Sequence, residues 1–138
     1  MTESKRWDAL IVHLQWSLCT GLLTSAQWVT FNKVCTDDLL RPAVGIAEGI
    51  LQLSWAYDFI PGRTFTVEIL HDGSVEWFFR SEARDICIGT EGHSVSALPP
   101  EALEYLRSTF YAIAHRSWWR RVFKRILPYK KDEAKDEG

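Results

Sequence analysis

Residues Phe65–Phe79, with the sequence FTVEILHDGSVEWFF, carry the clearest structural signal in this 138-residue chain. On both sides of His71-Asp72-Gly73, apolar residues mostly alternate with others, and the apolar set is rich in β-branched and aromatic side chains. Such a pattern is typical of two half-buried strands. The stretch therefore predicts a β-hairpin, and its turn decides which side chains share a face.

Two turns compete for this hairpin. A two-residue turn at Asp72-Gly73 would pair Glu68 with Trp77 and mix polar with apolar side chains on one face. A three-residue loop, with Gly73 in the left-handed conformation, instead makes one face wholly apolar. We therefore predict the second register, which contains three apolar pairs: Phe65 with Phe79, Val67 with Trp77 and Ile69 with Val75.

The same register sets Glu68 opposite Glu76 on the other face of the hairpin, where like charges are mildly destabilising. Two interpretations remain open. The carboxylates are either solvated, or they form an acidic contact face for a basic partner or for acid–base or metal chemistry. We predict a possible contact face there and assign neither a metal nor a catalytic role.

Length and composition predict one globular domain over residues 1–131, because seven tryptophans and seven phenylalanines supply a large core. A flexible acidic tail is expected over residues 132–138. Cys19, Cys35 and Cys87 are odd in number and lack metal-type spacing. They predict a reduced, cytoplasmic protein with all three thiols buried.

The uncharged run from Ala9 to Asn32 raises the question of a membrane or signal segment. Its histidine, glutamine, serine and threonine residues dilute the hydrophobicity, so we predict two buried helices instead. The first starts near Ser4 and the second covers Ser25–Cys35. The first buries residues spaced three and four apart, namely Trp7, Leu10, Ile11, Leu14 and Leu18.

A third helix is predicted from about Pro42 to Tyr57, with Gly45 and Gly49 four residues apart on it. The expected fold class is therefore α+β. A helical N-terminal half over residues 4–58, with about three helices, packs with an antiparallel meander over residues 64–89, whose third strand is 85–89. One or two C-terminal helices cover residues 100–127, and the first carries Leu103, Leu106, Phe110 and Ile113 toward the hairpin.

Charge separates sharply along the chain. Residues 1–104 hold 14 acidic and 7 basic side chains, whereas residues 105–131 hold 8 basic and no acidic ones. In the segment Arg116–Leu127 the charges also separate around a helix. Its apolar arc is Trp118, Trp119, Val122, Phe123 and Ile126, and its basic side is Arg116, Arg120, Arg121, Lys124 and Arg125.

This segment allows several interpretations. Its tryptophans can dock onto the domain and leave the basic side in solvent, or its basic side chains can bind nucleic-acid phosphates while aromatics stack. It can also lie in an anionic membrane surface, or in a groove of another protein. The predicted contact residues are the same for nucleic acid, membrane and partner: Arg116, Trp118, Trp119, Arg120, Arg121, Lys124 and Arg125.

Catalytic signatures are missing from the sequence. The four histidines are scattered, no nucleophile motif is present, and no cofactor is implied. We therefore expect a non-enzymatic binding or regulatory module that contacts a macromolecular partner, most simply a protein. The alternatives are an accessory nucleic-acid binder and a peripheral membrane protein, both using the basic C-terminal helix. The oligomeric state is left open.

Overall fold

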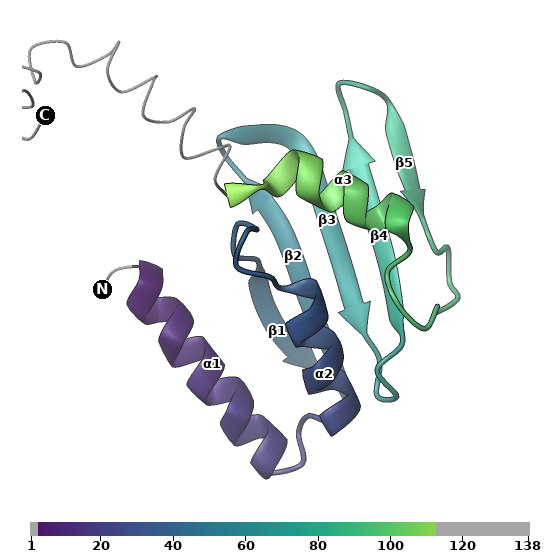
Figure 1. Cartoon of the computed structure of the whole chain (residues 1–138). Helices are drawn as coiled ribbons and strands as arrows, with labels where there is room; N and C mark the ends of the chain where they lie inside the picture. The colour runs from purple at the N-terminus through teal and green to yellow at the C-terminus, as the bar shows by residue number, and fades with distance from the viewer. Residues whose placement is uncertain (1–2, 113–138) are drawn as a thin grey trace, which may run out of the picture.

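The computed structural model describes residues 3–112 (Figure 1). Two helices come first, five strands follow, and one helix closes the described part. The helices are α1 (Glu3–Cys19), α2 (Ser25–Val34) and α3 (Pro100–Phe110). The strands are β1 (Ala43–Ala47), β2 (Ile50–Tyr57), β3 (Ile60–Ile69), β4 (Val75–Ser81) and β5 (Ile86–Gly89).

The five strands form one antiparallel sheet in the order β1-β2-β3-β4-β5, so each strand pairs with its neighbour in the sequence. The predicted register of the central hairpin is confirmed. Phe65 faces Phe79, Val67 faces Trp77 and Ile69 faces Val75. Gly73 has a φ of 87°, the left-handed conformation that the three-residue loop requires.

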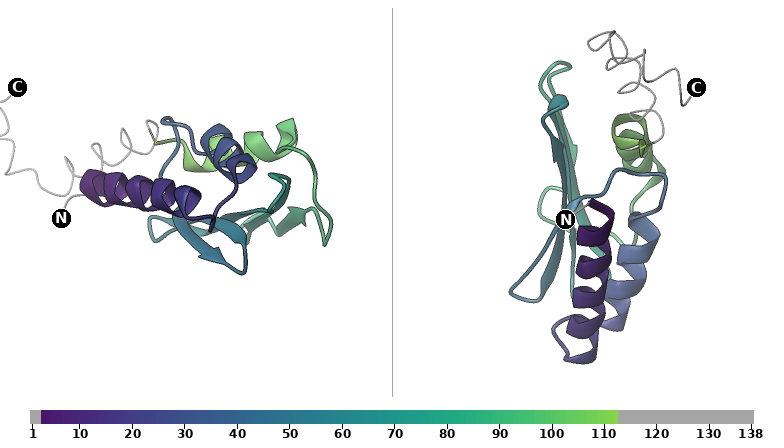
Figure 2. Two further views of the ribbon diagram at one scale, coloured as in Figure 1. Left: turned by 90° about the horizontal axis from the view of Figure 1, so that it is seen from below. Right: turned by 90° about the vertical axis from the view of Figure 1, so that its left-hand side faces the viewer.

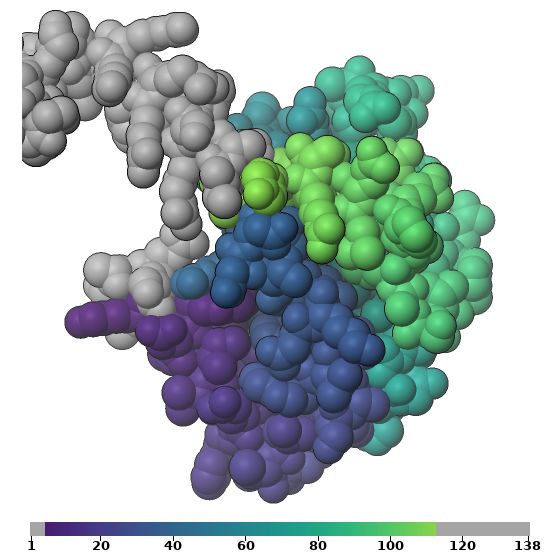
Figure 3. Space-filling model, in the orientation of Figure 1, coloured from purple at the N-terminus to yellow at the C-terminus, as the bar shows by residue number. Residues whose placement is uncertain are grey.

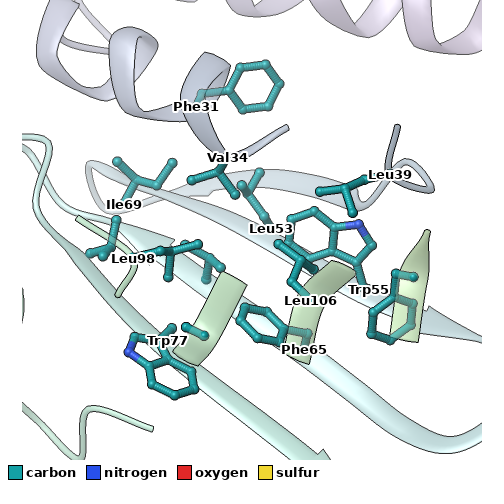
Figure 4. Close-up of a cluster of buried hydrophobic side chains, with 14 of the residues drawn as sticks. Phe31, Val34, Leu39, Leu53, Trp55, Phe65, Ile69, Trp77, Leu98 and Leu106 are labelled. Atoms are coloured by element: carbon teal, nitrogen blue, oxygen red, sulfur yellow. The ribbon is translucent and has the colours of Figure 1, made fainter. Parts of the chain in front are cut away.

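All three helices lie on the same side of the sheet, which gives a molecule of two layers (Figure 2). The core fills the space between the layers (Figure 4). Trp55 and Phe65 pack edge to face at 6.0 Å on the sheet side, and Leu106 and Phe110 of α3 are fully buried over the hairpin, as expected. The opposite side of the sheet has no described element over it (Figure 2).

The predicted helix over residues 42–57 is wrong, and with it the helical N-terminal half over residues 4–58. This stretch forms β1 and β2. Glu48 and Gly49 both have positive φ, as a two-residue hairpin turn of type I′ requires. Gly49 therefore makes a turn rather than a helical contact, and Leu51, Leu53 and Trp55 are buried at the spacing of two that a strand gives.

Other predicted elements agree with the structure. Both N-terminal helices are present, and Leu14, Phe31 and Val34 on them are buried. The strand predicted over residues 85–89 is β5, at the sheet edge beside β4. A helix begins at Pro100, as expected. The predicted helix over residues 116–127 and the acidic tail lie outside the described residues.

Buried Gln27 joins α2 to two hairpins at once. Its Nε2 donates to the carbonyl oxygens of Gly49 and Ile69, at 2.8 and 3.0 Å. Its Oε1 accepts the backbone N–H of Thr24, whose hydroxyl oxygen in turn accepts the N–H of Gln27. This capping box satisfies the helix N-terminus. One side chain thus ties the start of α2 to the β1–β2 turn and to the end of β3.

We predict that Gln27→Ala lowers the free energy of unfolding by about 2–4 kcal/mol, since a buried hydrogen bond to Ile69 and a partly buried one to Gly49 are lost and the helix loses half of its capping box. The matched control is Gln52→Ala, because Gln52 makes an exposed hydrogen bond to Glu68. Its expected effect is within about 0.5 kcal/mol. Urea unfolding of both variants checks this, and equal losses would contradict it.

Candidate protein-binding surface

The face of the sheet turned away from the helices is the candidate site, and we refer to it as the open face. Along each strand, every second residue is buried beneath the helices, and the residues between them point to the open face. Three rows of paired residues cross it. They are Gly45, Gln52, Glu68 and Glu76; then Ala43, Ser54, Thr66, Phe78 and Gly89; then Ala56, Thr64, Arg80 and Cys87.

Phe78 is the large apolar side chain of this face, and 41 % of it is exposed. Its neighbours across the strands are Thr66 and Gly89, which are too small to cover the ring. A β-carbon at Gly89 would lie 3.2 Å from the Phe78 ring and 2.2 Å from the carbonyl oxygen of Trp77. Glycine therefore lets β5 and the ring of Phe78 come close together.

Sequence reasoning did not single out Phe78, although the predicted register already contained the signal. That register places Trp77 and Phe79 in the core, so Phe78 between them must point to the face of Glu68 and Glu76. A run of three aromatic residues in a strand cannot be buried on one side only.

The predicted acidic pair is present as expected: Glu68 and Glu76 face each other on neighbouring strands. Gln52 donates a hydrogen bond of 2.8 Å to Glu68 Oε2, so the hydrogen-bond partner of this carboxylate is a neutral amide. Arg80 on the third row lies 3.8 Å from Glu82, and both side chains are largely exposed. The open face thus has an acidic first row and an apolar centre.

Residues 3–112 contain neither a candidate metal cluster nor a candidate membrane-spanning helix. No three side chains of His, Cys, Asp or Glu gather there in a way that could hold a metal ion. No helix within these residues is long and apolar enough to cross a membrane. The other predicted contact residues, from Arg116 to Arg125, lie outside the described part of the chain.

The prediction that all three thiols are buried is wrong for two of them. Cys19 is the last residue of α1 and is exposed, and Cys87 is exposed on the third row of the open face. Cys35 follows α2 and packs against the core. Burial raises the pKa of the Cys35 thiol to about 12.

No protein-family model, curated protein or solved structure matches this chain. Any inference about its function therefore depends on its own residues. Within residues 3–112, the relevant features are the surfaces that no other described element covers.

We predict that Cys35 is alkylated at least about 100-fold more slowly than Cys87 at pH 8. Its raised pKa keeps the reactive thiolate fraction at about 10⁻⁴, and its partial burial limits access by the reagent. Peptide mass spectrometry after timed iodoacetamide treatment measures both rates in one sample, and the two rates should converge in denaturant. Equal rates in the folded protein would contradict the prediction.

Proposed function

We propose that this protein is a non-catalytic binding module that contacts a partner protein through the open face of its sheet. The observation that carries this proposal is Phe78, a half-exposed aromatic ring among small residues on a face that no described helix covers.

This arrangement resembles the anatomy of protein interfaces in general. Binding energy concentrates in a few central side chains, aromatic ones among them, surrounded by a polar rim that excludes water. Phe78 lies in the second row on β4, next to the edge strand β5, and Glu68, Glu76 and Arg80 flank it on the first and third rows. The small side chains of Ser54 and Thr66 leave the surface flat enough for another backbone to approach.

The charge of the described residues points to a partner that presents a basic surface. Residues 3–112 hold 14 acidic and 8 basic side chains, an excess of six negative charges. On the open face the acidic row lies beside Phe78, and within residues 3–112 the hydrogen-bond donor to Glu68 is the neutral amide of Gln52. Opposite charges across an interface speed association and exclude wrong partners, and salt weakens both effects.

A second candidate function is supported by the basic segment Arg116–Leu127. Its arginines and lysines are suited to nucleic-acid phosphates, and its tryptophans to stacking or to a membrane surface. These are properties of the sequence alone, since the segment lies outside the described residues. The open face therefore carries the main proposal, and the basic segment its alternatives.

The test compares three forms of the full-length tagged protein in capture from native lysate. Phe78→Ser removes the ring from the open face, and Val29→Ser is the matched control, because Val29 is an exposed apolar residue of α2 on the helical side. We predict that a protein captured by the unaltered chain is lost at least tenfold with Phe78→Ser and kept with Val29→Ser. Charge is tested by combining Glu68→Gln with Glu76→Gln, which should lower the association rate more at low salt than at high salt.

Two results would contradict the proposal. One is equal capture by Phe78→Ser and the unaltered protein. The other is binding to nucleic acid that weakens steeply with salt, or binding to anionic vesicles, that Phe78→Ser leaves unchanged. Those outcomes would favour the basic segment as the functional element.

A further inference from the structure

Helix α1 has a second apolar stripe on the side turned away from the core. At 100° per residue, Val12 and Trp16 lie roughly 160° to either side of the buried Leu14. Val12 is 63 % exposed and Trp16 65 %. With Ala9 and Cys19, also exposed, they follow a spacing of three, four and three residues. This is the spacing of a seam that packs against another helix, and we refer to these four residues as the outer stripe.

Charge near the outer stripe is confined to its N-terminal end, where Lys5 and Asp8 lie beside Ala9. No Asp, Glu, Lys or Arg occurs between Ala9 and Asn32. In the space-filling view and the ribbon views, α1 forms an outer side of the helical layer, and no other described element lies over it (Figures 2 and 3). An exposed tryptophan in an uncharged surface is typical of a contact site.

The described chain ends close to the first turns of α1. Beyond α3, the N–H of Ala112 donates to the carbonyl of Asp38 at 2.8 Å, and the N–H of Leu40 donates to Phe110 at 2.8 Å. The next residue, Arg41, lies over the ring of Trp7 in α1 at 5.2 Å. Residues that follow Ala112 therefore start near the core-facing side of the first turns of α1, where Trp7 packs against the core, and must pass around the helix to reach the outer stripe.

The basic segment supplies a matching stripe. Trp119, Val122 and Ile126 are spaced three and four residues apart, as Ala9, Val12 and Trp16 are. A helix over residues 116–127 would be about 18 Å long, and the outer stripe spans about 15 Å. A chain that leaves Ala112 near the start of α1 would run parallel to α1, so the two series would meet in the same order.

We propose that residues 116–127 dock on α1 of the same chain, with Trp119 against Ala9, Val122 against Val12 and Ile126 against Trp16. In each outer pair a large ring meets a smaller side chain, which suits close packing. The basic side, including Arg120, Arg121 and Lys124, stays in solvent. The docked segment presents its positive charge while its tryptophans are covered.

The size of the stripe favours this occupant over a second copy of the chain. The stripe is about 15 Å long and one helix, about 10 Å, wide. Its footprint of roughly 150 Å² is far smaller than the roughly 800 Å² that each partner buries in a stable complex. A tether of a few residues raises the effective concentration of the segment to the millimolar range, so a small contact suffices within one chain.

A disulfide test in the full-length chain decides the matter. In a background with Cys19→Ala, Cys35→Ala and Cys87→Ser, Val12→Cys is combined with Val122→Cys, or with Arg121→Cys as the control on the basic side. Under mild oxidation we expect an intramolecular cross-link that forms at least tenfold faster from position 122 than from position 121. Non-reducing gels separate it from a cross-linked dimer.

A second measurement uses the single variant Val12→Cys in the same background. The thiol at position 12 should be alkylated at least tenfold more slowly than in the same protein carrying Val122→Asp, whereas Arg121→Asp should leave the rate unchanged. Equal cross-linking from positions 121 and 122, a cross-linked dimer as the main product, or a rate insensitive to Val122→Asp would each overturn the proposal.

Discussion

The hydrogen bonds of the Gln27 side chain are the constraint on which the arrangement of the layers depends. Its amide nitrogen donates to the carbonyl of Gly49, in the turn between β1 and β2, and to that of Ile69, the last residue of β3. Thr24 and Thr30 add bonds from α2 to the carbonyls of His71 and Gly73 in the β3–β4 turn, both at 2.7 Å. The bond to Ile69 is buried, and because a buried carbonyl without a donor is costly, this bond holds the start of α2 against the end of β3.

The place of α2 determines which surfaces remain uncovered. With α2 fixed at the turns of both hairpins, α3 covers β3 and β4 from the same side, and α1 lies outermost in the helical layer (Figure 1). The opposite face of the sheet is left to small and polar side chains, apart from Phe78. A β-carbon at Gly73 would lie 3.0 Å from Ala26, so even this turn is shaped to fit α2.

The sequence predicts the central hairpin to the residue, because one face of it is buried and a shift by one residue would expose that whole face. It fails over residues 42–57, where a helix and two strands explain the apolar residues almost equally well. The alternation of Leu51, Leu53 and Trp55 is the signal that distinguishes a strand from a helix here, and Gly49 is the signal for the turn that precedes it. The sequence also contains the Thr24-x-x-Gln27 spacing of a capping box, which is not among the features predicted above. It does not show that Gln27 bonds to carbonyls more than 20 residues away, since these meet only in the fold.

The open face and the outer stripe lie on opposite sides of the core and differ in the polarity of their side chains. The open face needs no cover for its own stability, since antiparallel sheets commonly expose one side and its residues are mostly small or polar. The outer stripe of α1 is different, because covering the apolar surface of Trp16 and Val12 would be favourable through the hydrophobic effect. The sequence predicts a second apolar stripe in the same chain, on a helix over residues 116–127 whose other side is basic. Both proposals follow from this difference: the outer stripe is assigned to a segment of the same chain, and the acidic open face to a partner.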